Sequence, residues 1–219
     1  MDFHLAGFDR QLLRTGITHL CGVDEAGRGP LAGPVVAAAV ILKENTEIPG
    51  IDDSKRLTEV VRETLEPQIK QSALVYGIGT VDEKEIERIN ILQATFKAMR
   101  LAVDDLMQTP DYILVDGRDF PVFYQKDSMQ PISGRAVIKG DRQSQCIAAA
   151  SILAKVHRDR LMREYDKAYP QYGFARHKGY ATKAHCSNIL KYGPCEIHRK
   201  SFLKRIYYSN QETINYRGI

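Results

Sequence analysis

The sequence lacks an apolar run long enough to cross a bilayer. Its longest apolar stretch, residues 31–42, contains Gly33 and Pro34 and is shorter than the roughly 20 residues that a spanning helix needs. It also lacks the basic start and apolar core of a secretory signal, because Asp2 and Asp9 lie among the first residues. We therefore expect a cytoplasmic protein with no membrane partner.

Cysteine is scarce, and no Cys-x-x-Cys pair occurs. The four cysteines, at positions 21, 146, 186 and 195, predict reduced thiols rather than disulfides in a chain of this size. One alternative is a zinc site near the C-terminus, where several side chains of the zinc-ligand type occur: His177, His185, Cys186, Cys195 and His198. Their irregular spacing argues against zinc.

Internal repeats, low-complexity tracts and a heptad seam are also absent from the sequence. A chain of 219 residues that is 43% hydrophobic can bury a substantial core. We predict that residues 1–219 form a single domain. We also expect a monomer, since no coiled-coil seam is present to pair two copies.

Acidic residues are scarce in one segment. Between Lys155 and Arg205 there are 13 basic and 4 acidic residues, whereas the rest of the chain holds 18 basic and 23 acidic ones. Several tyrosines are interleaved with these basic residues. The pattern predicts a basic, helical C-terminal part from about residue 155 to 205 that binds a polyanion such as nucleic acid. Solvated helix faces are the alternative explanation for the individual charges.

Hydrophobic periodicity predicts strands interleaved with helices. Apolar runs predict strands at residues 20–23, 35–42, 74–81, 112–115 and 136–139. Helical patterns cover residues 58–70, 90–107 and 144–165, and we expect Pro67 to shorten the first helix. These elements predict an α/β fold that has a mixed sheet, helices on its faces and a helical C-terminal portion.

Two adjacent carboxylates, Asp24 and Glu25, end the first apolar run, and a glycine-rich loop follows. Hard cations such as Mg²⁺ prefer carboxylate oxygen, and glycines allow backbone N–H groups to approach a phosphate. Successive strand side chains point to opposite faces, so the two acids can share a site only if the chain bends there. Arg28, between Gly27 and Gly29, supplies a charged fork suited to phosphate. The alternative is an ordinary strand-to-loop corner.

Two further acids stand beside glycines near later strand ends. Asp116 precedes Gly117, and Asp141 follows a glycine. Hydrolysis of a phosphodiester needs an activated water and a stabilised leaving oxygen, which two divalent ions held by three or four carboxylates provide. The candidate catalytic and metal-binding residues are therefore Asp24, Glu25, Asp116 and Asp141. For Asp141 alone, a helix N-cap is the alternative interpretation.

Eight ordered motifs resemble those of a known family, bacterial ribonuclease HII. They are GVDEAGRGPLAGPVV at residues 22–36, DSK at 53–55, VDG at 115–117, KGD at 139–141, AASILAKVHRDR at 149–160, PQYGF at 170–174, HKGY at 177–180 and HRKSF at 198–202. The resemblance extends from roughly residue 18 to 205.

This resemblance implies a ribonuclease H-like fold and an endonuclease whose partners are RNA–DNA hybrids and duplex DNA with embedded ribonucleotides. It implies cleavage on the 5′ side of the ribonucleotide with Mg²⁺ or Mn²⁺ as cofactor, leaving 3′-hydroxyl and 5′-phosphate ends, and a role in removing ribonucleotides from DNA. The four acids would form the metal site. The substrate-binding residues would be Gly27, Arg28 and Gly29, which read the ribose 2′-hydroxyl and its phosphate, Tyr180 at the RNA-to-DNA junction, and Lys55 at a phosphate.

The sequence departs from the family pattern in two places. Ala181 stands where the family has proline, which predicts a looser placement of Tyr180. The segment between Asp116 and Asp141 is longer than the family pattern leads us to expect, so residues 120–135 are predicted to form an extra loop.

Other classes of protein would use some of these features. A DNA resolvase or exonuclease would share the fold and the acid cluster but would cut a substrate without ribose. A non-catalytic hybrid-binding module would use the basic segment alone, although four acids near a polyanion repel phosphate unless metal neutralises them. A structural zinc protein would contain bound zinc in metal analysis.

Overall fold

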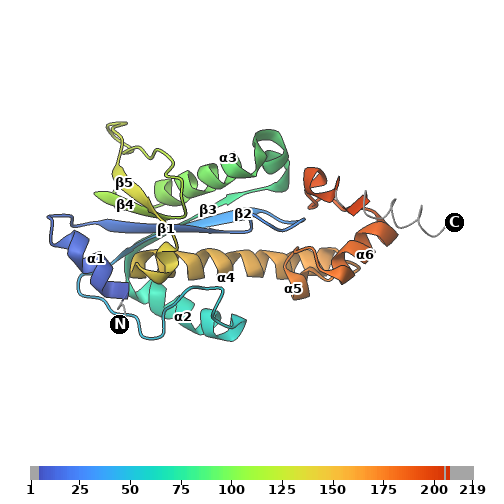
Figure 1. The fold of residues 1–219 in the computed structure, drawn as a ribbon, viewed down its shortest axis with the longest axis horizontal. Helices are drawn as coiled ribbons and strands as arrows, with labels where there is room; N and C mark the ends of the chain where they lie inside the picture. Colours follow the sequence, from blue (N-terminus) through green and yellow to red (C-terminus); the bar gives the residue numbers. More distant parts are fainter. Residues whose placement is uncertain (1–4, 205, 208–219) are drawn as a thin grey trace.

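A five-stranded mixed sheet forms the centre of the computed structural model, which describes residues 5–204, 206 and 207 (Figure 1). Its strands are β1 (Leu20–Ala26), β2 (Val35–Leu42), β3 (Ala73–Val81), β4 (Tyr112–Asp116) and β5 (Ser133–Val137). They lie in the order β3-β2-β1-β4-β5. β2 is antiparallel to β1 and β3, whereas β4 is parallel to β1 and β5. The predicted mixed sheet is confirmed.

Helices cover both faces of this sheet. They are α1 (Leu5–Leu13), α2 (Glu59–Ser72), α3 (Glu83–Asp104), α4 (Gln145–Ala168), α5 (Phe174–His177) and α6 (Lys183–Tyr192), with short 3₁₀ helices η1 (Gly140–Arg142) and η2 (Lys200–Leu203). Figure 1 shows α3 on one face, α1, α2 and α4 on the other, and α5 and α6 beyond the sheet at the far end of α4. The helical C-terminal portion is confirmed. Among the described helices, none has both the length and the apolar character that crossing a membrane requires.

The central strand β2 explains why the sheet carries two helical layers. Its eight residues are apolar, and seven are buried. Side chains alternate between the faces with a period of two. Ala37 and Ala39 therefore pack in the cluster that contains α3, while Val36 and Ala38 pack in the cluster that contains α2 and α4. A strand that is buried on both faces has a continuous apolar sequence, as β2 does.

Two expectations about the helices were wrong. Helix α2 covers the predicted residues to within two at each end, but Pro67 does not shorten it: the helix passes through Pro67, which lies on its exposed side, and continues to Ser72. Helix α3 begins at Glu83 rather than near Asn90. Asn90 has φ 67° and ψ 165°, which interrupts the helix, and its Oδ1 accepts hydrogen bonds from the backbone of Leu92 and Gln93. The predicted start near residue 90 therefore corresponds to the second segment of α3.

The fifth strand differs from the prediction. The strand ends at Val137 rather than residue 139, because Lys139 adopts left-handed geometry, with φ 55°, and turns the chain into η1. The predicted extra loop is present over residues 120–132, which contain no helix or strand and are largely exposed at 124–131, but two of its side chains anchor it to the core. Phe123 and Ile132 are buried in the cluster beneath α3, and the segment's last residues form the start of β5.

Candidate active site

Three carboxylates from three different elements converge at one end of the sheet. Asp24 lies near the end of β1, Asp116 ends β4, and Asp141 lies in η1. Each offers an oxygen atom, and these atoms all lie within 4.8 Å of one another. The convergence follows from topology, because β1 and β4 are parallel neighbours with Val23 opposite Val115. The next residue of each strand therefore emerges at the same edge.

The turn before α4 positions Asp141. The backbone N–H of Gly140 donates a hydrogen bond to Oδ1 of Asp116 at 2.7 Å. A side chain at Gly140 would collide with Ile147, because a Cβ atom there would lie 2.5 Å from Ile147 Cδ1. The N-cap alternative for Asp141 was wrong, since Ser144 caps α4 by accepting a hydrogen bond from the backbone of Ile147.

Main-chain contact fixes the distance between β1 and α4. A Cβ atom on Gly22 would lie 2.2 Å from the carbonyl carbon of Cys146, so only glycine fits at this crossing. Asp24 is two residues further along β1. Ser151 on α4 faces Asp24 and lowers its pKa, and the Ser151 hydroxyl lies 2.8 Å from that of Ser54.

The electrostatics of this cluster favour the binding of a cation. Burial raises the pKa of Asp24 well above its usual value, and repulsion from Glu25 and Asp116 adds to the increase. Burial, with repulsion from Asp116 and Asp53, raises the pKa of Asp141 to about 6. Carboxylates arranged in this way resist ionising together unless a cation neutralises them. An all-oxygen donor set fits a hard divalent ion such as Mg²⁺ or Mn²⁺.

Glu25 lies beside this cluster. Among the described residues, the group of converging carboxylates contains the three aspartates and does not include Glu25. One of its oxygens lies 3.4 Å from Nη1 of Arg28. Burial raises the pKa of Glu25, Arg28 opposes this increase and Asp116 adds to it. Glu25 is therefore close enough for the charge of Asp116 to raise its pKa, while its side chain contacts Arg28 of the glycine-rich loop.

Lys55 borders the cluster from the loop before α2. Its Nζ atom lies 3.9 Å from Oδ2 of Asp141, and its side chain is 77% exposed. Burial would lower the pKa of Lys55, but the negative charges of Asp24, Asp141 and their neighbours outweigh burial and raise it. An exposed cation at the edge of an acidic site is suited to contact a phosphate.

The glycine-rich loop and Tyr180 form one surface. Gly27 and Gly33 have φ values of 103° and 85°, which other residues adopt only with strain. The backbone N–H of Leu31 donates to the carbonyl of Gly179 at 2.8 Å. A Cβ atom on Gly29 would lie 3.8 Å from Cε1 of Tyr180. The structure thus brings together loop and tyrosine from segments about 150 residues apart in the sequence.

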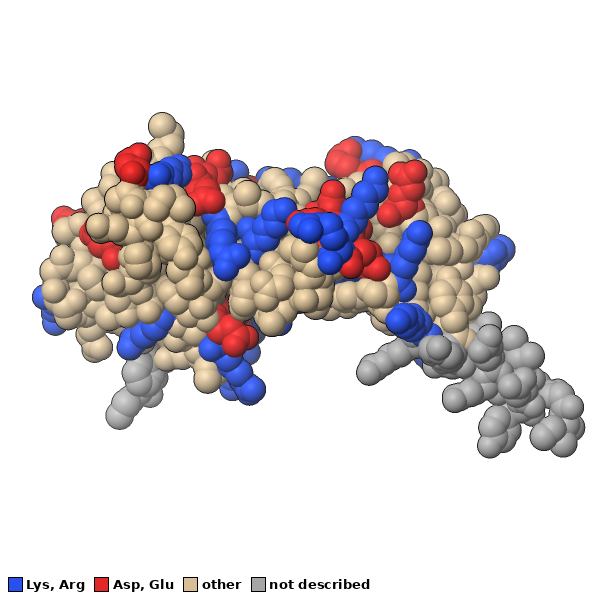
Figure 2. Space-filling model, turned by 90° about the horizontal axis from the view of Figure 1, so that it is seen from above, with Lys and Arg blue, Asp and Glu red and all other residues tan. Residues whose placement is uncertain are grey.

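The basic C-terminal segment is less basic at the surface than its composition predicts. Arg158 and Arg199 are buried. Several others pair with carboxylates, as Arg163 does with Glu59 and Glu63. On the face shown in Figure 2, basic and acidic side chains are intermingled rather than gathered into one basic stripe. The basic residues of this segment that are exposed and lack an ion pair within the described chain are Arg176, Lys183, Lys191, Lys200 and Lys204.

The histidine and cysteine cluster shows no zinc geometry. His185 and His198 direct their Nε2 atoms at each other, 3.0 Å apart. In the part of the chain that the structure describes, the only group whose ligand atoms converge as a metal requires is the three aspartates. All four cysteines are free.

Comparison with known proteins identifies the family. The family profile of ribonuclease HII matches residues 21–209. A ribonuclease HII from Caldicellulosiruptor saccharolyticus is 52% identical over 206 residues, which cover 94% of this chain and 97% of that protein. Another, from Caldanaerobacter subterraneus, is 52% identical over 199 residues, which cover 91% of this chain and 80% of that protein. The chain belongs to the ribonuclease HII family.

Solved structures confirm the ribonuclease H-like fold of this ribonuclease HII. Ribonuclease H2 from Pyrococcus horikoshii OT3 has a TM-score of 0.69 and 27% identity, covering 86% of this chain and 97% of that one. Bst-RNase HIII in complex with Mn²⁺ has a TM-score of 0.57 and 19% identity, covering 84% of this chain and 64% of that one.

The protein is a metal-dependent nuclease of the ribonuclease H type that acts on RNA–DNA hybrids. Family membership argues against the DNA resolvase and binding-module alternatives.

Sequence reasoning assigned no role to two arginines that hold the loop of this ribonuclease HII. Arg199 donates hydrogen bonds to backbone carbonyls of the loop, which are those of Gly27, Arg28, Pro30 and Gly33. Arg158 donates to the carbonyls of Ala32, Pro34 and Lys178. Both guanidinium groups lie beneath the loop. The available signal was the position of Arg158, seven residues after Ser151 on the buried face of α4.

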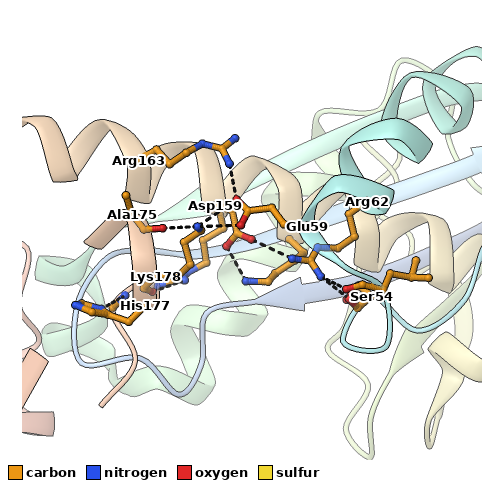
Figure 3. A network of polar contacts seen from close by, with 12 residues as sticks. Ser54, Glu59, Arg62, Asp159, Arg163, Ala175, His177 and Lys178 are labelled. Atoms are coloured by element: carbon orange, nitrogen blue, oxygen red, sulfur yellow. Dashed lines mark hydrogen bonds and ion pairs between the residues drawn. The ribbon is translucent and has the colours of Figure 1, made fainter. Parts of the chain in front are cut away.

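A second network, drawn in Figure 3, ties the loop before α2 to the turn before Tyr180. Asp159 on α4 accepts from Lys155 at 2.6 Å and pairs with Arg62 at 3.5 Å. Arg62 donates to the carbonyl of Ser54, next to Lys55. Lys178, two residues before Tyr180, pairs with Glu59 on α2.

Proposed function

We propose that this ribonuclease HII cuts the RNA strand of RNA–DNA hybrids and also cuts on the 5′ side of single ribonucleotides embedded in duplex DNA. The products would carry 3′-hydroxyl and 5′-phosphate ends, so the enzyme would act in ribonucleotide removal. The observation that carries this proposal is the position of three converging aspartates beside a surface formed by the glycine-rich loop and Tyr180.

The acids have a defined part in this proposal. Asp24, Asp116 and Asp141 would hold Mg²⁺ or Mn²⁺, with Glu25 beside them. When bound, the metal supplies an activated water and stabilises the charge that develops on the leaving oxygen. Without it, the buried negative charge of the acids repels a phosphodiester. Support for Mn²⁺ comes from the similar fold of Bst-RNase HIII, which was solved in complex with that ion.

Substrate recognition is assigned to the surface beside the acids. The carbonyls of the glycine-rich loop point inward to Arg199, which favours the approach of its N–H groups at Gly27 and Gly29 to a phosphate. The ribose 2′-hydroxyl is the group that distinguishes RNA from DNA, and this loop would read it. Tyr180 would contact the RNA-to-DNA junction, and Lys55 and Arg28 would contact phosphates.

The proposal extends to the whole chain. Residues 1–219 would act as one catalytic domain and as a monomer in the cytoplasm, since the acids, the loop and Tyr180 all come from one chain. Light scattering in solution would measure the oligomeric state, and a dimer would contradict this part of the proposal.

Cleavage of duplex DNA that contains one ribonucleotide tests the central claim. The assay is run with Mg²⁺, with Mn²⁺ and with chelator, and the cut is mapped to the nucleotide. We expect a metal-dependent cut on the 5′ side of the ribonucleotide and no cut in the matched all-DNA duplex. Cutting of the all-DNA duplex, or hybrid cleavage with no cut at a single ribonucleotide, would contradict the proposal.

A further inference from the structure

Three imidazoles surround the turn that carries Tyr180, and the proposed chemistry uses none of them. His185 and His198 are buried, and His177 is half-buried. Buried imidazoles far from a metal need hydrogen-bond partners for both ring nitrogens. The partners found here are mostly main-chain groups of the turn itself.

The ends of one hydrogen-bond chain fix the tautomers of two of these rings. The backbone N–H of Cys195 donates to Nδ1 of His198 at 2.9 Å, so a neutral His198 carries its proton on Nε2. That proton faces Nε2 of His185 at 3.0 Å, which must therefore accept it. The proton of His185 then lies on Nδ1, which donates to the carbonyl of Tyr180 at 2.9 Å. The backbone N–H of Cys195 at one end can only donate, and the carbonyl of Tyr180 at the other end can only accept. Only one placement of the two ring protons satisfies both ends.

His177 repeats this arrangement on the other side of the turn. The backbone N–H of Gly179 donates to Nδ1 of His177 at 3.2 Å, and Nε2 of His177 lies 2.8 Å from the carbonyl of Tyr172. The rings of His177 and His185 are stacked, with centroids 4.3 Å apart. Figure 3 shows His177 beside Lys178, at the start of the same turn. Imidazoles thus hold a main-chain group on each side of the Gly179–Tyr180 peptide bond.

The surroundings of the pair favour neutral rings. Burial lowers the pKa of both His185 and His198 to about 4, and the neighbouring His177 contributes to the decrease for each. The aromatic rings of Phe174 and Tyr172 also face the pair. An added proton on His198 would place two N–H donors against each other at Cys195.

The chain of contacts continues into the glycine-rich loop. His198 precedes Arg199, whose guanidinium group holds the loop carbonyls. The backbone N–H of Arg199 also donates to the carbonyl of Leu31 at 2.8 Å. Two adjacent residues, His198 and Arg199, therefore act on both sides of the same surface. His198 orients His185, which holds the carbonyl of Tyr180, and Arg199 orients the glycine-rich loop that faces Tyr180.

We propose that His185 and His198, in these fixed neutral tautomers, are positioning residues that set Tyr180 against the glycine-rich loop and so determine how strongly the enzyme prefers an RNA-to-DNA junction. The inference rests on the proposed function, because Tyr180 must contact the junction for its placement to matter.

A double-mutant cycle tests this coupling. The variants are His185→Phe, Tyr180→Ala and the double variant, assayed on a junction substrate and on a hybrid whose cleaved strand is all RNA. We expect His185→Phe to lower kcat/KM on the junction roughly tenfold, because small displacements of a contact group are costly, and to affect the all-RNA hybrid much less. In the Tyr180→Ala background, His185→Phe should have little further effect. Equal losses in both backgrounds, or on both substrates, would overturn the proposal.

Two further variants separate positioning from folding. His185→Asn keeps an amide N–H near Nδ1 that can donate to Tyr180, so it should retain more junction preference than His185→Phe. His19→Phe is the matched control, because His19 lies just before the start of β1, whereas Asp24 lies near the end of that strand. It should leave the junction preference unchanged. If His185→Asn loses as much preference as His185→Phe, the hydrogen bond to Tyr180 is not the cause and the proposal fails.

A spectroscopic measurement is independent of activity. ¹⁵N NMR of the histidine-labelled wild-type protein at neutral pH should show His185 as the neutral Nδ1–H tautomer and His198 as the neutral Nε2–H tautomer. A charged ring or the opposite tautomer at either position would overturn the assignment. If the wild-type protein fails to cut at a ribonucleotide, the proposed function fails, while the NMR result still decides the hydrogen-bond chain.

Discussion

Asp24 is a buried carboxylate that carries two roles with opposite demands. The proposed catalysis needs its charge to bind metal, whereas burial and the neighbouring acids oppose that charge. We predict that Asp24→Asn abolishes cleavage and raises the melting temperature of the metal-free protein by a few degrees, on the order of 2–4 °C per kcal/mol of relieved repulsion. The asparagine Oδ1 can still accept the hydrogen bond that the backbone N–H of Glu25 donates. Calorimetry and the cleavage assay check both results.

Asp104→Asn, at an exposed acid that ends α3, is the control for this substitution and should change neither measurement. Cleavage at the wild-type rate by a folded Asp24→Asn protein would contradict the assignment of the site.

Metal addition should act on the same carboxylates. We predict that Mg²⁺ or Mn²⁺ raises the melting temperature of the wild-type protein, because a ligand that binds only the folded state stabilises it. The increase should be much smaller in Asp141→Asn, which removes the negative charge of one of the three converging carboxylates. An equal metal-induced increase in wild type and variant would show that the ion binds elsewhere. Differential scanning fluorimetry across a metal titration measures the melting temperature of both proteins.

At the scale of elements, the segment between β4 and β5 is anchored in the core by Phe123 and Ile132. Phe123 is 2% exposed and packs in the cluster beneath α3, while the adjacent Val122 is 47% exposed. We predict that Phe123→Ala lowers the free energy of unfolding by about 3–5 kcal/mol. Val122→Ala should cost less than about 1 kcal/mol, since it vacates no buried volume. Urea unfolding measures both, and equal small effects would show that the segment is a loose insertion.

The region around α6 should respond to acid through its buried imidazoles, of which His185 lies in α6 and His198 in the loop between α6 and η2. The folded pKa of about 4 for His185 and His198 lies below the usual value of 6.5. Their contribution to stability is therefore complete above pH 6.5 and is lost as pH falls from 6.5 through 4. We predict that the melting temperature of wild type falls more steeply over this range than that of His198→Asn. Parallel curves for the two proteins would contradict the buried, neutral state.

At the scale of the whole molecule, we expect nucleic-acid binding to depend on a small set of exposed cations at the end that carries α5 and α6 (Figure 1). Using the inactive Asp24→Asn protein, we predict that Arg176→Gln with Lys183→Gln weakens hybrid binding and reduces the salt slope by about 1 for each lost phosphate contact. Arg14→Gln, just after α1 at the other end, should leave the slope unchanged. Fluorescence anisotropy at several salt concentrations gives the slopes, and an unchanged slope in the double variant would place the binding surface elsewhere.

The sequence was sufficient to predict that Asp24, Asp116 and Asp141 converge, but it wrongly placed Glu25 with them and did not predict the residues that support the site. Asp24 and Asp116 follow apolar runs and stand near glycines, so their place at strand ends could be predicted. The role of Arg199 could not be predicted, because its partners are carbonyls such as that of Gly33, 166 residues earlier in the chain. Counting charges overestimated the basic surface, since a count does not show that Arg158 is buried. The end of β5 was wrong because the left-handed geometry of Lys139 has no signature in hydrophobic periodicity.

The main-chain contact at Gly22 has a consequence for how the site assembles. Because backbone meets backbone where β1 crosses α4, side-chain rotamer motion on the picosecond to nanosecond scale leaves the spacing between the two elements unchanged. The entropy of bringing β1 and α4 together is then lost once, when the chain folds, and is not lost again when metal binds. An ion would then meet carboxylates that are already in place, so its affinity would reflect coordination rather than assembly, and a residue larger than glycine at position 22 would lower metal affinity without touching a ligand.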